Sequence, residues 1–67
     1  MTPTKRQIAR RLRTLANRMA DVAADMDYYG GFAEWSQHGK ELLGAARIAR
    51  QWADEIEIEA LAEKGKA

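Results

Sequence analysis

Residues 8–31 read IARRLRTLANRMADVAADMDYYGG, and this stretch predicts the fold. Apolar residues recur three and four positions apart along it, and a pair of glycines follows. This spacing places the apolar side chains on one face of a helix, and glycine commonly ends a helix. The apolar positions are Ile8, Leu12, Leu15, Met19, Val22, Met26 and Tyr29.

A second helical stripe begins after the glycines. Its members are Phe32, Gly39, Ala46, Ala53 and Ala60, seven residues apart, with Trp35, Leu42, Ala49 and Ile56 between them. We therefore expect an all-α fold, a two-helix antiparallel hairpin that forms one domain over residues 1–67. The expected bounds are about 4–28 for the first helix, 29–31 for the turn, about 32–63 for the second helix and 64–67 for a frayed tail. Ser36 is an alternative start for the second helix.

Local signals support these bounds. Thr4 followed by Gln7 matches a capping box, and Pro3 suits the start of a helix. Gly30 or Gly31 is expected to provide the left-handed residue that closes the first helix. Two rows of small residues, Gly39/Ala46/Ala53/Ala60 and Ala9/Ala16/Ala23, are expected to pack against a neighbouring helix.

The length of the chain predicts self-association. A 67-residue chain buries only ~60% of the surface that its unfolded form exposes. Small domains often compensate with disulfides or a metal, but this sequence has no cysteine and a single histidine. We therefore expect a homodimer that forms a four-helix bundle, with parallel or antiparallel hairpins.

Charge is unevenly distributed although the formal net charge is +1. Residues 1–20 contain six basic residues and no acidic one, and residues 54–63 contain five acidic residues and no basic one. Antiparallel pairing would bring these blocks together. We expect Lys5 and Arg6 to meet Asp54, Glu55 or Glu57 there.

Two groups of residues are candidates for binding a partner. Arg6, Arg10 and Arg13 form a stripe expected to face away from the apolar core and from the other helix. The stripe fits a solvated face, an acidic protein surface or a phosphate backbone, although a near-neutral chain disfavours nucleic acid. Trp52 and Ile48 lie to one side of the second stripe, and either fill the dimer interface or anchor a different protein.

No residue set predicts catalysis. His38 lies between Glu34 and Glu41, but one imidazole and two exposed carboxylates make a poor metal site. We expect a non-enzymatic protein without cofactor or metal. The basic N-terminus leads into Leu12-Arg13-Thr14 instead of an apolar segment, and no apolar run approaches ~20 residues, so we expect a cytoplasmic protein without membrane contact.

The arginine-rich first helix, the Gly-Gly turn and residues 45–57, AARIARQWADEIE, resemble short helical hairpins encoded by temperate phages. These include anti-activators that bind host quorum-sensing regulators. The architecture over about residues 4–63 is also similar to Rop-type RNA-binding hairpins. The first resemblance implies a dimeric helical adaptor or inhibitor of a host protein, such as a bacterial transcriptional regulator. The alternatives are a Rop-like RNA-binding hairpin and a purely structural oligomerisation module.

Overall fold

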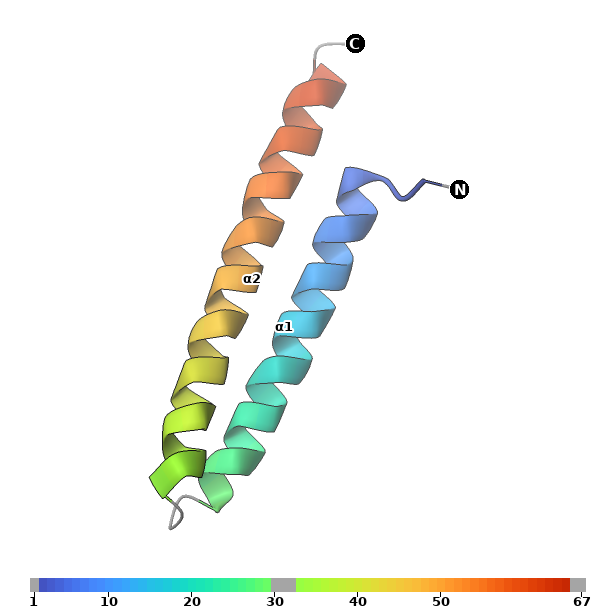
Figure 1. The fold of residues 1–67 in the computed structure, drawn as a ribbon. Helices are drawn as coiled ribbons and strands as arrows, with labels where there is room; N and C mark the ends of the chain where they lie inside the picture. The colour runs from blue at the N-terminus through green and yellow to red at the C-terminus, as the bar shows by residue number, and fades with distance from the viewer. Residues whose placement is uncertain (1, 30–32, 66–67) are drawn as a thin grey trace.

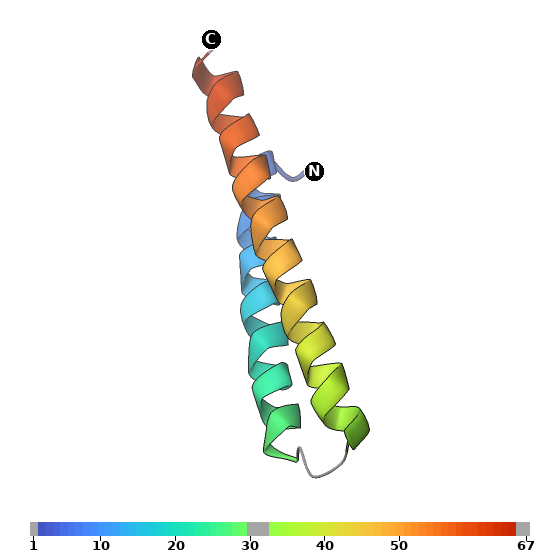
Figure 2. The same cartoon turned by 90° about the vertical axis from the view of Figure 1, so that its left-hand side faces the viewer.

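The computed structural model describes residues 2–29 and 33–65, which form two α-helices. Helix α1 spans Lys5–Tyr28 and helix α2 spans Ala33–Gly65. The helices lie side by side and run in opposite directions, and α2 continues past the start of α1 (Figure 1, Figure 2). The hairpin measures 55 × 21 × 13 Å between Cα atoms. The predicted all-α hairpin is therefore confirmed.

The start of α1 follows the predicted capping chemistry. The backbone N–H of Gln7 donates to Thr4 Oγ1 at 3.1 Å, and the backbone N–H of Thr4 donates to Gln7 Oε1 at 2.8 Å. This reciprocal pair is a capping box, and it satisfies two backbone donors that the helix leaves unpaired. At the other end, the Tyr29 N–H donates to the Met26 carbonyl at 3.1 Å. The predicted glycine closure at residues 30–31 lies outside the described residues.

The second helix differs from its predicted bounds. It is already helical at Ala33, so the alternative start at Ser36 is wrong. It also continues to Gly65, two residues beyond the predicted end at Glu63. Lys5 forms ion pairs with Glu59 and Glu63 in the last turns of α2. Phe32 and residues 66–67 lie outside the described residues.

Small side chains form the contact between the two helices. Among the residues that the structure describes, the buried apolar side chains are Ala9, Ala16 and Ala23 of α1 and Ala46, Ala49 and Ala53 of α2, and Gly39 is buried beside them. We call this contact the alanine seam. A Cβ atom added at Gly39 would lie 3.3 Å from the Ala23 carbonyl oxygen, so the backbones approach closely there. The prediction that the small-residue rows pack against a neighbouring helix is confirmed.

The large apolar residues of α1 lie beside the alanine seam. Ile8, Leu15 and Val22 keep 39%, 52% and 51% of their surface exposed. In the part of α1 that the structure describes, Leu12 and Met19 pack partly against the buried cluster of Ala16, Ala46 and Ala49. The predicted apolar stripe is thus real, but it is not the surface that joins α1 to α2.

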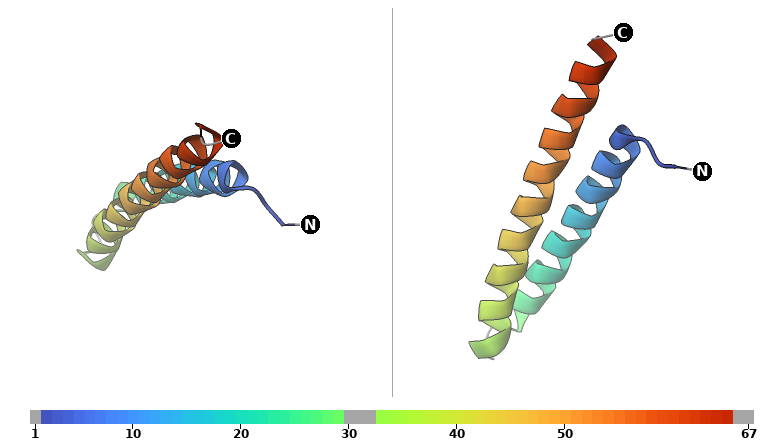
Figure 3. Two further views of the ribbon diagram at one scale, coloured as in Figure 1. Left: turned by 90° about the horizontal axis from the view of Figure 1, so that it is seen from above. Right: turned by 45° about the horizontal axis from the view of Figure 1, so that its top comes forward.

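Aromatic rings connect the helix ends near the turn. Tyr28 and Tyr29 meet edge to face with ring centroids 5.1 Å apart, and Tyr29 meets Trp35 in the same way at 5.6 Å. These contacts link the end of α1 to the first turn of α2. In the part of the chain that the structure describes, neither helix is long and apolar enough to cross a membrane. Figure 3 shows both helices from above and from an intermediate angle.

Candidate protein-binding surfaces

The hairpin has two broad sides, one on each side of the alanine seam. At 100° per residue, Arg13 and Asn17 lie on one side of Ala16. Arg13 donates to Asp54 and Glu57 of α2, and Arg50 of α2 donates to Asn17 at 3.0 Å. These bonds show which side of α2 adjoins that side of α1. We call this side of the hairpin the polar flank.

The opposite side of the hairpin is apolar. Leu12 and Met19 lie there, against the Ala49 edge of the seam. The same helical geometry places Trp52 of α2 on this side, away from Asp54. We call this surface the apolar flank. It contains Ile8, Leu12, Leu15, Met19 and Val22 of α1 and Leu42, Ala45, Ala49, Trp52 and Ile56 of α2.

Arg13 forms ion pairs with α2. The prediction that Arg13 is a free member of the arginine stripe is therefore wrong. The guanidinium of Arg13 lies 2.6 Å from Asp54 Oδ1 and also donates to Glu57. The hydrogen bond that Arg13 donates to Glu57, followed by the one that it donates to Asp54, raises the pKa of Arg13 above its ordinary value. The helical position of Arg13 is only about 60° from the seam, and a long arginine side chain reaches across it.

Arg6 and Arg10 are the two members of the stripe that remain available. Neither takes part in an ion pair between residues that the structure describes. Both are exposed, and they line an open depression on the polar flank. The other residues of this depression are Arg13, Thr14, Asn17 and Glu57. The surface therefore combines free cations with a carboxylate and an amide.

The partners of Lys5 also differ from the prediction. Lys5 Nζ lies 3.2 Å from Glu59 Oε1 and also contacts Glu63. These hydrogen bonds, that of Glu63 first, raise the pKa of Lys5 above its ordinary value. The register of the two helices is responsible, because it brings Asp54 and Glu57 level with Arg13, two turns beyond Lys5.

Trp52 and Ile48 are both exposed, at 55% and 48% of their surface. Trp52 lies on the apolar flank, and Ile48 lies at the outer edge of that flank on α2. Arg6 and Arg10 lie on the polar flank. The five residues predicted to bind a partner therefore divide between two sides of the molecule and do not form one site.

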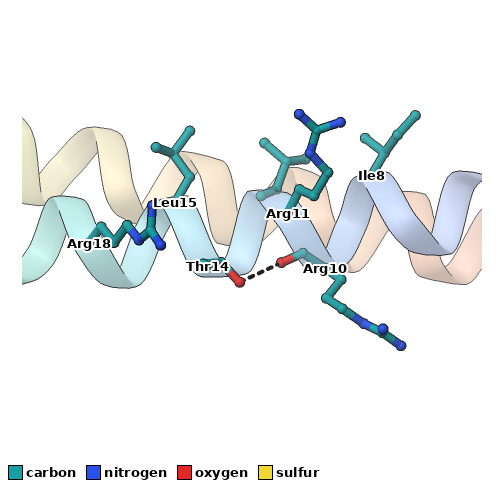
Figure 4. A pocket seen from close by; sticks show the side chains of 7 residues that line it. Ile8, Arg10, Arg11, Thr14, Leu15 and Arg18 are labelled. Atoms are coloured by element: carbon teal, nitrogen blue, oxygen red, sulfur yellow. Dashed lines mark hydrogen bonds between the residues drawn. The ribbon is translucent and has the colours of Figure 1, made fainter. Parts of the chain in front are cut away.

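Arg11 and Arg18 are potential interface residues that the sequence interpretation missed. With Ile8, Leu12 and Leu15 they line a shallow depression along α1, in which Arg10 and Thr14 also take part. Figure 4 shows Arg11 projecting between Ile8 and Leu15, whereas Arg10 points to the other side of the helix. The signal in the sequence is the seven-residue spacing of Arg11 and Arg18, which places both along the outer edge of the apolar flank.

The described residues offer little that suits metal binding. His38 Nδ1 lies 3.8 Å from Glu41 Oε1, and both side chains are exposed. Among the described residues, no group of three or more His, Cys, Asp or Glu could hold a metal ion. Comparison with known proteins found no matching family, no similar curated protein and no similar solved structure.

Proposed function

We propose that this chain is a non-enzymatic helical hairpin that forms a homodimer and binds another protein as an adaptor or inhibitor. The class of partner follows from the resemblance to phage-encoded hairpins, which implies a host protein such as a bacterial transcriptional regulator. Action in the cytoplasm is part of this proposal.

One observation supports self-association above all: the hairpin buries alanines and leaves its larger apolar side chains exposed. Burying one methyl group contributes only ~0.8 kcal/mol, whereas burying a whole leucine or isoleucine side chain contributes ~1.5–3 kcal/mol. The strongest apolar contribution available to this chain is therefore unused in a single hairpin. A partner that covers the apolar flank would supply it.

The polar flank is the surface that we propose for the other protein. Arg6 and Arg10 are free to donate to carboxylates or carbonyl oxygens, and Asn17 and Glu57 lie in the same depression. Such a mixture of donors and acceptors suits a protein surface. A phosphate backbone would fit less well, because Glu57 would repel it and Asp54 and Glu57 already neutralise Arg13.

Affinity capture from a bacterial lysate tests this proposal. We expect tagged wild-type chain to retain a protein partner after nuclease treatment, and the Arg6→Ala/Arg10→Ala double variant to lose it. Lys40→Ala/Arg47→Ala is the matched control, since it removes two exposed cations from α2 and should retain the partner.

RNA titration separates the alternatives. Binding of RNA that weakens steeply with salt and requires Arg6 and Arg10 would favour the Rop-like function. A chain that forms a stable dimer but captures neither protein nor RNA would be an oligomerisation module.

A further inference from the structure

We infer that a second copy of this chain covers the apolar flank, with the turns of both hairpins at the same end of the dimer. In this arrangement α1 of each copy packs against α2 of the other copy. The inference rests on the proposed self-association and adds its surface and its direction. It also places Trp52 in the dimer interface.

The apolar flank is large enough for a stable dimer. It is one of the two broad faces of the hairpin, whose Cα extents are 55 Å and 21 Å. A standard stable interface buries ~800 Å² per partner, so the apolar flank together with its charged edges has to be covered over most of this face. A second copy is the suitable occupant. The core of a single hairpin consists of alanines, so its exposed larger apolar side chains need a partner as soon as the chain folds, and other copies of the chain are always present.

The sizes of the side chains favour one direction of packing. The α1 half of the apolar flank carries five large side chains, Ile8, Leu12, Leu15, Met19 and Val22, whereas the α2 half mixes Leu42, Trp52 and Ile56 with Ala45 and Ala49. Packing α1 against α2 of the second copy sets each uniformly large stripe against a stripe that contains alanines, which divides the side-chain volume evenly between the two contacts. Turns at opposite ends would pack α1 against α1 and α2 against α2, which gathers the uniformly large stripes in one contact and the alanines in the other.

The register of the hairpin then gives the contacts of Trp52. Asn17 and Arg50 are hydrogen-bonded, so positions 17 and 50 lie at the same height along the hairpin. When both turns are at one end, residues 15–19 of one copy come level with residues 48–52 of the other. Trp52 then lies beside Leu15 of the second copy, which would cover its exposed ring.

Charges along the outer edges of the apolar flank favour the same direction. The edge of α1 carries Arg11, Arg18 and Asp25, seven residues apart, with two cations and one anion. The edge of α2 carries only acidic charges, those of Glu34, Glu41, Glu55 and Glu59. Same-end packing joins edges of opposite net charge: it brings Arg11 level with Glu55 of the second copy, and Asp25 comes level with Glu41. Opposite-end packing would instead align the two acidic edges of α2.

Distance measurement between spin labels tests the direction. The sequence has no cysteine, so Gln37→Cys gives one labelling site per chain, near the turn. Same-end packing predicts a label separation limited to the width of the bundle. Opposite-end packing predicts about 40 Å along the axis, because position 37 lies 13 residues from the midpoint at Arg50, at 1.5 Å per residue. Arg47→Cys, close to the midpoint, is the control and should give a short separation in either case.

Charge reversal gives an independent test with opposite signs for the two directions. Glu55→Lys should weaken the dimer roughly fivefold, because it places a cation opposite Arg11 at two symmetry-related positions. Adding Arg11→Glu should restore the affinity. Arg47→Glu, an exposed change outside the apolar flank, is the charge control and should leave the affinity unchanged. In opposite-end packing, Glu55→Lys would relieve acidic repulsion and tighten the dimer.

Truncation of Trp52 tests its assignment to the interface. We expect Trp52→Ala to weaken the dimer by roughly tenfold or more, as for a central aromatic residue. An intact dimer that captures less of the other protein would overturn the assignment and make Trp52 an anchor for that protein. A monomeric wild-type chain at all concentrations would overturn the proposed self-association, whereas a dimer with distant Gln37→Cys labels would overturn only the same-end packing.

Discussion

Replacing Gly39 and Gly44 with alanine, one at a time, measures how closely the two helices approach. Both glycines lie inside α2, where alanine is favoured over glycine by ~0.5–1 kcal/mol. A Cβ atom at Gly44 would meet nothing within 4 Å. Gly44→Ala should therefore raise the free energy of unfolding by this whole amount.

Gly39→Ala should behave differently because of the alanine seam. Its Cβ atom would lie 3.3 Å from the Ala23 carbonyl oxygen and 3.8 Å from Met26 Cβ. The first distance is tight, and a backbone oxygen moves only when the helix moves. Forcing extra atoms into a packed contact costs ~1–3 kcal/mol, which cancels or exceeds the gain in helix propensity. We expect Gly39→Ala to be no more stable than the wild type, and ~1 kcal/mol or more below Gly44→Ala.

Urea and thermal unfolding, followed by far-UV circular dichroism at one fixed chain concentration, measures this difference. A change of 1 kcal/mol shifts the Tm by roughly 4–8 °C in a domain of this size. Wild-type helicity in both variants is the control for an intact fold. Equal stabilisation by the two substitutions would refute the close approach of the helices at Gly39.

Three further changes address the apolar flank and the ion pairs. Leu15→Asp should cost the assembled state ~3 kcal/mol or more and reduce the solution mass to that of a monomer, because it buries a charge. Ile58→Asp, on the far side of α2, should keep the mass, and equal behaviour of the two variants would contradict the assignment of the flank. Arg13→Ala should lower the Tm slightly at low salt and less at high salt, since salt screens its exposed pairs with Asp54 and Glu57; a difference independent of salt would argue against those pairs. Lys5→Gln should be less stable than the wild type below pH 10.5, with a difference that disappears as the pH rises above 10.5. The reason is that the ion pairs that raise the pKa of Lys5 in the folded state stabilise the fold only while Lys5 is charged. A stability difference between the variant and the wild type that grows at alkaline pH would contradict this prediction.

The sequence by itself determined the helices, because their signals are local. The spacing of the apolar residues and the Thr4/Gln7 capping box depend on residues within one or two turns. The blocks of opposite charge likewise pointed to antiparallel pairing. These features predicted the all-α hairpin and the bounds of α1, and the structure confirms them.

The sequence predicted that the small-residue rows pack against a neighbouring helix, but only the tertiary structure decided that this neighbour is the other helix of the same hairpin. Along α1, the Ala9/Ala16/Ala23 row and the row of Ile8, Leu15 and Val22 both recur every seven residues, so periodicity does not distinguish them. Packing distance does, because only the small residues allow the close approach seen at Gly39. That choice leaves the large side chains exposed on the apolar flank.

The register of the helices determined which of the predicted binding residues pair with the other helix. It brings Asp54 and Glu57 level with Arg13, which joins Arg13 to α2, whereas Arg6 and Arg10 form no ion pair with any residue that the structure describes. Angles around one helix do not contain this information, since a long guanidinium side chain can reach a partner well away from the seam. The division of the candidate residues between a polar and an apolar flank is therefore a property of the paired helices and not of either helix alone.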